Sequence, residues 1–322
     1  MFVSAYSTIS HQASFQRHGF SAKLTALSAP SEVVHPDYAS LIPPMYRRRM
    51  TDVLKMSIAC TMDCLAQVSV EQPGAIIVGT SMGCSTFTQR FLDKIYAARQ
   101  GGRISPTSFI LSTHNSIAGQ ISLLLGNHNY NMTHTQNSVS FEQGLMDAML
   151  HLKDGLDNVL AGGADEAINA LYNIHTRLGV ENIHPSSGAS FFLLTAEAKA
   201  SPTVAVIDVE SHGLISDAPS LISTFLQTNH LSESEIDLVL YASSFRTQVS
   251  ELTALFQAEQ LFDYQSISGS YLTNSAFAMA YGVDILHQGD FPFRDRQIRR
   301  ILICNQVIPE NIGLILLEAK TG

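Results

Sequence analysis

The sequence has few of the residues and segments that mark several common protein classes. Its four cysteines, at positions 60, 64, 84 and 304, form no CxxC pair. Cys60 and Cys64 are one helical turn apart but have no further ligands for a zinc site. We therefore predict buried, reduced thiols, Cys84 included. No apolar run approaches the roughly 20 residues that span a bilayer, and no signal peptide opens the sequence, so a cytoplasmic protein without membrane insertion is expected.

Positive charge is also scarce. The chain has 19 lysines and arginines against 28 aspartates and glutamates, a formal net charge of −9. Such a balance does not suit binding to the phosphates of nucleic acids, so no nucleic-acid partner is expected. The arginine triplet at positions 47–49 is a local exception. It is interpreted as the solvated start of a helix or, alternatively, as a contact for a phosphate or a partner protein.

The twelve histidines do not point to a metal site. Five of them are scattered between loops and helices, and none of the five shows a His-x-x-x-His pattern on a helix with a carboxylate nearby. Ordinary surface or capping roles, and no metal, are expected for His128, His134, His151, His175 and His184.

Apolar runs and helical periodicity alternate along the chain, which predicts an α/β fold. In the first part we expect strands at residues 2–7, 75–78, 159–163 and 189–194, and helices at 46–65, 87–98, 117–125 and 141–148. After a joint at residues 200–203 we expect strands at 204–209, 236–241, 300–304 and 313–318, and helices at 219–227, 249–260 and 276–286. The continuous apolar strands are typical of a sheet that helices cover on both faces.

Residues 79–83, Gly-Thr-Ser-Met-Gly, match the Gly-x-Ser-x-Gly elbow of α/β-hydrolases, between a strand and a helix. A serine hydrolase would use Ser81, together with Asp165 or Asp237 and with His287. No His-Gly oxyanion segment precedes the motif, and the bare pattern has many false positives. A hydrolase therefore stays a minor alternative.

Four blocks of the sequence resemble, in their order, the β-ketoacyl synthases of the thiolase-like superfamily. They are the glycine loop at 74–83, the Asn-x-x-Ala-Gly segment from Asn115 to Gly119, Gly-Gly-Ala-Asp-Glu-Ala at 162–167 and Ser-Gly-Ala at 187–189. Each block alone is weak, and their shared order from about residue 47 onward carries the resemblance. It implies a layered αβαβα fold built from two related halves, residues 1–200 and 201–322.

The reactive groups of that family are missing here. Gln136, or with a one-residue shift Asn137, stands where the resemblance places the reactive cysteine. Ser243 and Ser270 stand where it places two histidines, and Asn305 is retained. Condensation needs a thiolate to carry the acyl group and imidazoles to stabilise the developing negative charge. Because these groups act together, their joint loss removes the mechanism.

An amide at this turn can still form hydrogen bonds. In the family the turn precedes a buried helix, whose free N–H groups favour partial negative charge. The carboxamide oxygen of Gln136 is therefore expected to bind at that helix N-terminus. Among the family's inactive members, the chain-length factors of type II polyketide synthases, a glutamine replaces the cysteine.

The resemblance implies a non-catalytic subunit that pairs with an active β-ketoacyl synthase and receives an acyl carrier protein, in a polyketide, polyene or fatty-acid-like pathway. No cofactor is expected. The segment 115–119 would lie at the interface, with His114, His134, Glu166 and Asn305 near the pocket. Bulky side chains would close the acyl tunnel, and the candidates are Phe109, Leu111, Phe141 and Met146. The alternative is a degenerate synthase that decarboxylates malonyl groups through Gln136, or an acyl-transfer enzyme using Ser81.

Overall fold

Ten strands join in one sheet in the order β3-β2-β4-β5-β1-β6-β12-β11-β7-β8. The structure is a computed structural model that describes residues 1–25, 27, 32–99, 106–170, 173, 185–199, 203–243, 246–291 and 294–320. The strands of the first half are β1 (Phe2–Ile9), β2 (Ala75–Gly79), β3 (Tyr130–His134), β4 (Asn158–Asp165) and β5 (Gly188–Thr195). Those of the second are β6 (Thr203–Gly213), β7 (Leu238–Ser243), β8 (Leu261–Asp263), β11 (Arg300–Gln306) and β12 (Asn311–Lys320). The short strands β9 (Asp290–Phe291) and β10 (Arg294–Gln297) form a separate ribbon.

The two runs of five strands share one topology. In the first, β2 is parallel to β3 and β4, while β5 is antiparallel to both β4 and β1. In the second, β7 is parallel to β8 and β11, while β12 is antiparallel to both β11 and β6. Only two residue pairs between β1 and β6 join the runs, Phe2 with Ala205 and Val3 with Val204. The expected boundary between residues 200 and 201 lies outside the described residues.

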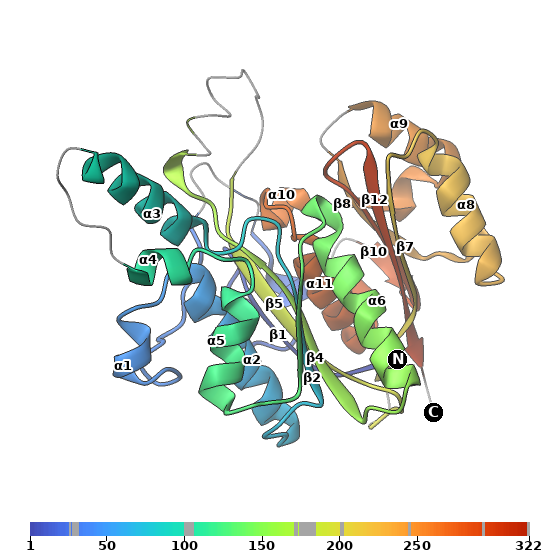
Figure 1. The fold of residues 1–322 in the computed structure, drawn as a ribbon. Helices are drawn as coiled ribbons and strands as arrows, with labels where there is room; N and C mark the ends of the chain where they lie inside the picture. The colour runs from blue at the N-terminus through green and yellow to red at the C-terminus, as the bar shows by residue number, and fades with distance from the viewer. Residues whose placement is uncertain are drawn as a thin grey trace.

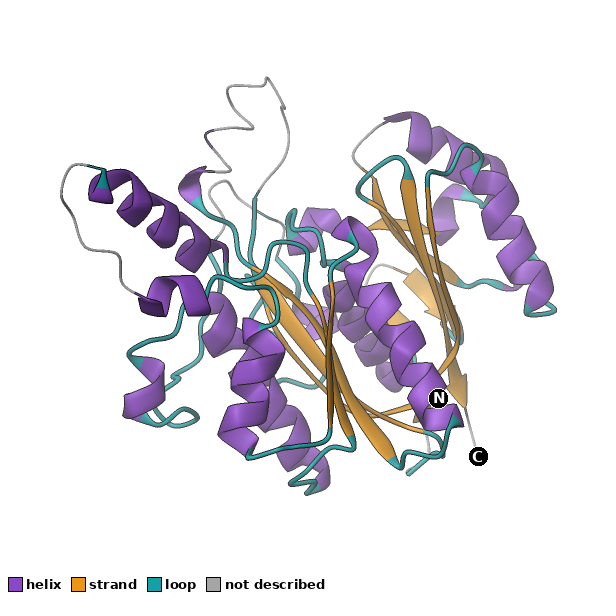
Figure 2. Ribbon diagram, in the orientation of Figure 1, coloured by secondary structure: helices purple, strands orange, loops and turns teal. Residues whose placement is uncertain are grey.

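Helices cover both faces of each run and separate the runs from each other (Figures 1 and 2). One apolar cluster lies between the first run of strands and the helices α2 and α5. A second surrounds the central helices α6 and α11, and a third lies between the second run and the helices α8 and α9. This is the predicted αβαβα layering. The helices are α1 (Pro44–Arg47), α2 (Asp52–Val68), α3 (Ser85–Ala98), α4 (Pro106–Ile110), α5 (Ser116–Leu125), α6 (Ser140–Lys153), α8 (Ala218–Thr228), α9 (Arg246–Leu255), α10 (Gln265–Ser268) and α11 (Ser275–Gln288).

The helix expected from residue 46 to 65 is two helices. Helix α1 ends at Arg47, and Thr51 is extended with φ −76° and ψ 173° before α2 begins at Asp52. Helix α1 has no buried residue, whereas Val53 and Leu54 at the start of α2 are buried. The break allows α2 to face the core while the arginine triplet stays at the surface.

Strand β3 was not expected from the sequence. It is at the end of the strand order, and three of its five residues are exposed. A short edge strand with a polar, exposed surface lacks the continuous apolar run that identified the buried strands.

Among the described helices, none is both long and apolar enough to cross a bilayer.

Candidate functional site

The parallel strands of the first half end at one edge of the sheet, and the segments that follow them form the candidate site. Gly79 at the end of β2 pairs with His134 of β3 and with Gly163 of β4. The turn after β3 leads into the central helix α6 (Figure 1). Helix α11 approaches from the second half, since a Cβ on Gly163 would lie 2.7 Å from Ala276 Cβ. The site therefore lies where the two halves meet.

Asp165, at the end of β4, ties this junction together. Its carboxylate accepts hydrogen bonds from the backbone N–H groups of Ser81 and Met82, at 3.1 and 2.8 Å. It also accepts from the hydroxyls of Thr80 and Thr273, at 2.9 and 2.8 Å. Burial raises the pKa of Asp165, and these hydrogen bonds oppose the rise. The loop after β2 is thus fixed to the second half through one buried carboxyl group.

Glu166 caps two helices at once. One carboxylate oxygen accepts from the N–H of Thr86 in the first turn of α3 at 2.8 Å, and the other accepts from the N–H of Val53 in the first turn of α2 at 3.4 Å. Neither helix has a side-chain cap from the residue that precedes it. Burial raises the pKa of Glu166, and the N–H groups oppose this. We expected Glu166 near the pocket, but its side chain is buried in the scaffold.

The turn between β3 and α6 presents two amide side chains. Asn137 has a φ of 52°, in the left-handed region that few non-glycine residues adopt. The N–H of Gln136 donates to Ser140 Oγ at 2.8 Å, and that hydroxyl donates to the carbonyl of Asn137 at 2.7 Å. Both amide side chains are exposed, and that of Gln136 makes no capping hydrogen bond. The expectation that the Gln136 carboxamide binds at the helix N-terminus is therefore wrong.

Behind the turn, a buried carboxyl group faces the second half. Glu142 of α6 is fully buried, and Asn305 Nδ2 donates to Glu142 Oε1 at 2.9 Å and to the carbonyl of Ser138 at 2.7 Å. A Cβ on Gly313 of β12 would lie 2.6 Å from Glu142 Cδ, so only glycine fits there. Burial raises the pKa of Glu142 to about 7, although Asn305 acts to lower it. Sequence analysis identified Asn305 but missed Glu142.

The two serines at the expected histidine positions differ in how they are placed. Ser243 ends β7 and pairs with Gln306 of β11, while its side chain lies outside the described residues. Ser270 is half-buried, and its carbonyl accepts from the N–H of Ser186 at 3.0 Å. Sequence analysis missed His11, whose Nδ1 lies 3.0 Å from Ser186 Oγ. Burial lowers the pKa of His11. Because His11 comes from the start of the chain, no local pattern could place it here.

His134 does not face the amide turn. Its Nε2 lies 2.9 Å from Asp147 Oδ2 on α6, and His151 Nε2 lies 3.5 Å from the other oxygen of Asp147. The Tyr130 hydroxyl donates to Asp147 at 3.2 Å. His114, the other histidine expected near the pocket, is exposed. His134 therefore belongs to a surface cluster between β3 and α6.

The segment expected at an interface is exposed only at its two ends, since residues 116–118 are buried. Asn115 is exposed just before α5, and a Cβ on Gly119 would meet no atom within 4 Å. On the neighbouring surface Leu123 is 70% exposed, and Tyr130 and Met132 of the edge strand β3 are 37% and 38% exposed. Exposed apolar side chains beside an edge strand indicate a surface that a partner covers.

The four candidate tunnel stops lie in different surroundings. Phe141 is 1% exposed and packs against Phe192 with ring centroids 5.7 Å apart. Met146 is half-buried and accepts from Ser211 Oγ, while Leu111 is half-buried beside a hollow of about 440 Å³. Phe109 is 56% exposed on α4. Only Phe109 therefore presents most of its side chain to a partner.

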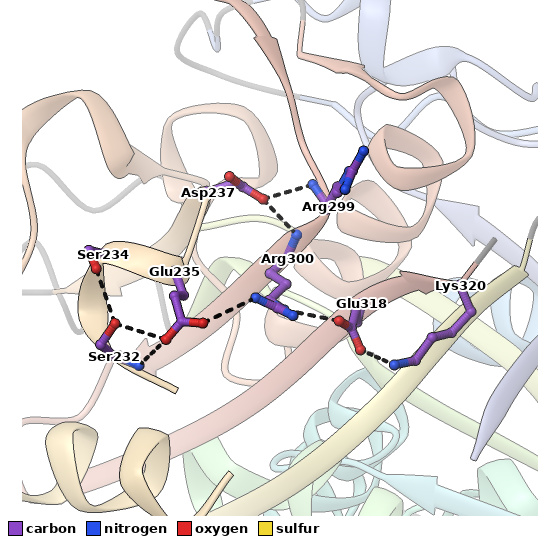
Figure 3. A network of polar contacts seen from close by, with 8 residues as sticks. All are labelled: Ser232, Ser234, Glu235, Asp237, Arg299, Arg300, Glu318 and Lys320. Carbon is purple, nitrogen blue, oxygen red and sulfur yellow. Dashed lines mark hydrogen bonds and ion pairs between the residues drawn. The ribbon is translucent and has the colours of Figure 1, made fainter. Parts of the chain in front are cut away.

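The residues of the hydrolase alternative are far apart. Asp165 binds the backbone of Ser81, but His287 lies near the other end of α11, and 14 residues of helix extend about 20 Å. His287 instead packs near Tyr6, with ring centroids 6.1 Å apart. Asp237 accepts from the N–H groups of Arg299 and Arg300 in a separate polar network (Figure 3). No Ser–His–Asp arrangement forms from these residues.

The thiols are buried as predicted. Burial raises the pKa of Cys60, Cys64 and Cys84, and it raises the pKa of Cys304 to about 12. A thiol with a raised pKa is a poor nucleophile at neutral pH. Within the described ranges, no group of three or more His, Cys, Asp or Glu residues could hold a metal ion.

Comparison with known proteins identifies a family. The family model "Beta-ketoacyl synthase, N-terminal domain" matches residues 21–219, more than half of the chain. No curated protein matches by sequence.

Solved structures match over nearly the whole chain. The ishigamide ketosynthase/chain length factor is 18% identical with a TM-score of 0.80, and 99% of each chain is covered. A ketosynthase (ApeO) in complex with its chain length factor (ApeC), from Xenorhabdus doucetiae, is 12% identical with a TM-score of 0.77, over 99% of this chain and 98% of that one. AntDE:AntF, a type II PKS acyl-carrier protein in complex with its ketosynthase, is 14% identical with a TM-score of 0.79 over 99% of each chain. These likenesses confirm the predicted thiolase-like fold.

Proposed function

Because the chain belongs to the β-ketoacyl synthase family, we propose that it is a non-catalytic subunit that pairs with an active β-ketoacyl synthase as a chain-length factor does. One observation carries the proposal: the β3–α6 turn presents amides where the family resemblance places the reactive cysteine. All four thiols are buried elsewhere. A carboxamide cannot hold an acyl group as a thioester.

We assign the cysteine position to Asn137. Left-handed backbone at a strand-to-helix turn is strained, and strain of this kind is typical of residues that present a side chain for function. Asn137 has this conformation and Gln136 does not. Both side chains are exposed in the isolated chain, so a partner on this face would enclose them.

The partner surface of the proposal is the edge strand β3 with helix α5. The exposed side chains of Leu123, Tyr130 and Met132 provide apolar contacts, and the open Cβ position of Gly119 permits a close approach. A paired subunit would also satisfy the free edge of β3. The similar structure of a ketosynthase in complex with its chain length factor supports a heterodimer as the assembly to test.

A carrier protein would dock at helix α1. Its residues are all outside the core, and a hollow of about 460 Å³ beside it is lined by Arg47, Arg48 and Lys55. Asp37 also lines this hollow and Lys55 pairs with Asp52 at 3.0 Å, so Arg47 and Arg48 supply its positive charge on a chain of net charge −9. This positive charge would steer an acidic carrier toward the pair.

Co-expression with ketosynthases tests the proposal. The chain and a true partner should co-purify as a one-to-one pair, and the pair should condense malonyl-carrier protein while this chain alone does not. Leu123→Asp, in the proposed interface, should abolish co-purification, whereas Leu214→Asp, at a side chain 93% exposed elsewhere, should not. Malonyl decarboxylation or condensation by the purified chain without a partner would overturn the proposal in favour of a degenerate enzyme.

A further inference from the structure

The buried carboxyl group of Glu142 is not used by the proposed function, and it lies directly under the amide turn. Asn305 connects three parts of the molecule, because its Nδ2 group donates both to Glu142 of α6 and to the carbonyl of Ser138 in the turn. Asn305 itself belongs to β11 in the second half. One side-chain amide therefore fixes the turn and the start of α6 to the opposite sheet.

Several buried oxygen atoms around the contact between Asn305 and Glu142 have no hydrogen-bond partner. Among the described residues, three buried oxygens of the groups that Asn305 joins have no hydrogen-bond partner; they are Glu142 Oε2, Asn305 Oδ1 and Ser138 Oγ. The Ser275 hydroxyl and the backbone of α6 also lower the pKa of Glu142, but burial outweighs them. A carboxylate with one occupied oxygen is poorly compensated when it is buried. A proton on Glu142 removes the charge and gives the carboxyl group an O–H that a neighbouring oxygen can accept.

Within the part of the chain that the structure describes, no neighbouring group provides a countercharge to Glu142. The titratable side chains that face it are Tyr264, after β8, and Cys304 of β11. Burial raises the pKa of both, so both are neutral at pH 7. Helix α11 and strand β12 present Ser275 and Gly313, which do not titrate.

We propose that Glu142 and Asn305 form a proton-linked latch, in which protonated Glu142 keeps the β3–α6 turn fixed to β11 and loss of the proton favours local opening of the turn. Opening brings the carboxyl group to water, where it releases its proton to solvent. The latch does not depend on the proposed function, since it involves only contacts within this chain.

Linkage sets the size and direction of the effect. In the closed state the pKa of Glu142 is about 7, whereas a solvated glutamate titrates near 4.3. The equilibrium for opening should therefore rise about tenfold per pH unit between these values and level off above pH 7, a total on the order of 500-fold. The exposed turn residue Asn137 would then be mobile at high pH and fixed at low pH.

Amide hydrogen exchange of the full chain tests the latch. Exchange of a peptide covering residues 136–144 is followed by mass spectrometry from pH 5.5 to 8.5 and corrected for the intrinsic pH dependence of exchange. The corrected exchange should rise about tenfold per unit up to pH 7 in the wild type. It should be independent of pH in Glu142→Gln, which keeps the acceptor for Asn305. Glu166→Gln, at a buried carboxyl group away from this turn, should keep the wild-type slope.

Each contrary result would overturn the latch. A flat wild-type profile would mean that opening of the turn releases no proton. The same slope in wild type and Glu142→Gln would assign the proton to another group. If Glu142→Gln fails to fold, the wild-type protein alone still tests the latch. The pH dependence of amide exchange in the turn is then compared with that of amides in the sheet core. A slope in the core alone would tie the proton only to global unfolding.

Discussion

Replacement of Asp165 by alanine should be among the most destabilising single changes at the junction of the two halves. The carboxylate accepts from two backbone N–H groups and two threonine hydroxyls, and it is 2% exposed. Alanine would leave the N–H groups of Ser81 and Met82 without this acceptor in a half-buried loop, and the buried hydroxyls of Thr80 and Thr273 without theirs. Each buried, unsatisfied donor costs about 1–3 kcal/mol. The hydroxyls can rotate toward other acceptors, so the two N–H groups dominate, and we expect a loss of about 4 kcal/mol.

The assay is urea unfolding followed by circular dichroism, because the chain has no tryptophan for fluorescence. In thermal unfolding, a chain of this length has an unfolding entropy of about 0.7 kcal/mol per kelvin at its midpoint. A loss of about 4 kcal/mol should therefore lower the Tm by about 6 °C. Asp165→Asn keeps one oxygen for the N–H groups and should cost only about 1–2 kcal/mol. Asp157→Ala, at an exposed aspartate, is the control and should be near neutral. A loss below about 1 kcal/mol for Asp165→Ala would refute the assignment of this carboxyl group as the tie.

Three further predictions follow from the same structure. Since the folded pKa of Glu142 is raised to about 7, its contribution to stability is complete below about pH 4.3 and should be lost as pH rises through 7, by about 4 kcal/mol. Glu142→Gln should remove this dependence in urea titrations across pH. In the proposed pair, Phe109→Ala should lengthen the product seen by mass spectrometry, whereas Phe141→Ala should cost about 3–5 kcal/mol of stability; an unchanged product with Phe109→Ala would remove that residue as a stop. Alanine at each arginine of 47–49 should weaken carrier binding roughly two- to fivefold and reduce its salt dependence, measured by calorimetry at two ionic strengths; equal affinity in all variants would place the docking site elsewhere.

The buried framework was predictable from the sequence, because burial on both faces leaves a direct pattern. The strands around Ile77, Leu160 and Phe192 contain continuous apolar runs, and every residue of these runs is buried in the sheet. The same reasoning missed β3, whose exposed residues carry no such pattern. It also joined α1 to α2, since only the extended conformation of Thr51 separates them.

The site was less predictable, because its decisive contacts join distant parts of the chain. Asn305 meets Ser138 across 167 positions, and Ser186 meets His11 across 175. Glu142 looks like an ordinary polar residue of an amphipathic helix until both faces of α6 are covered. The sequence favoured Gln136 and offered Asn137 only with a one-residue shift, and the backbone conformations of the two residues are the basis for preferring Asn137. Sequence patterns report local periodicity, whereas these features depend on tertiary packing.

The position of β1 in the sheet affects how the polypeptide is made. Its neighbours are β5 and β6, so Phe2 pairs with Thr195 and with Ala205. During synthesis, this first strand emerges from the ribosome long before either neighbour exists, and closing so large a loop is slow. Its apolar residues and both of its edges stay unprotected until β5 and β6, at residues 188–195 and 203–213, have been translated. Yield in a heterologous host should therefore depend on chaperone supply and growth temperature more than on the stability of the finished protein.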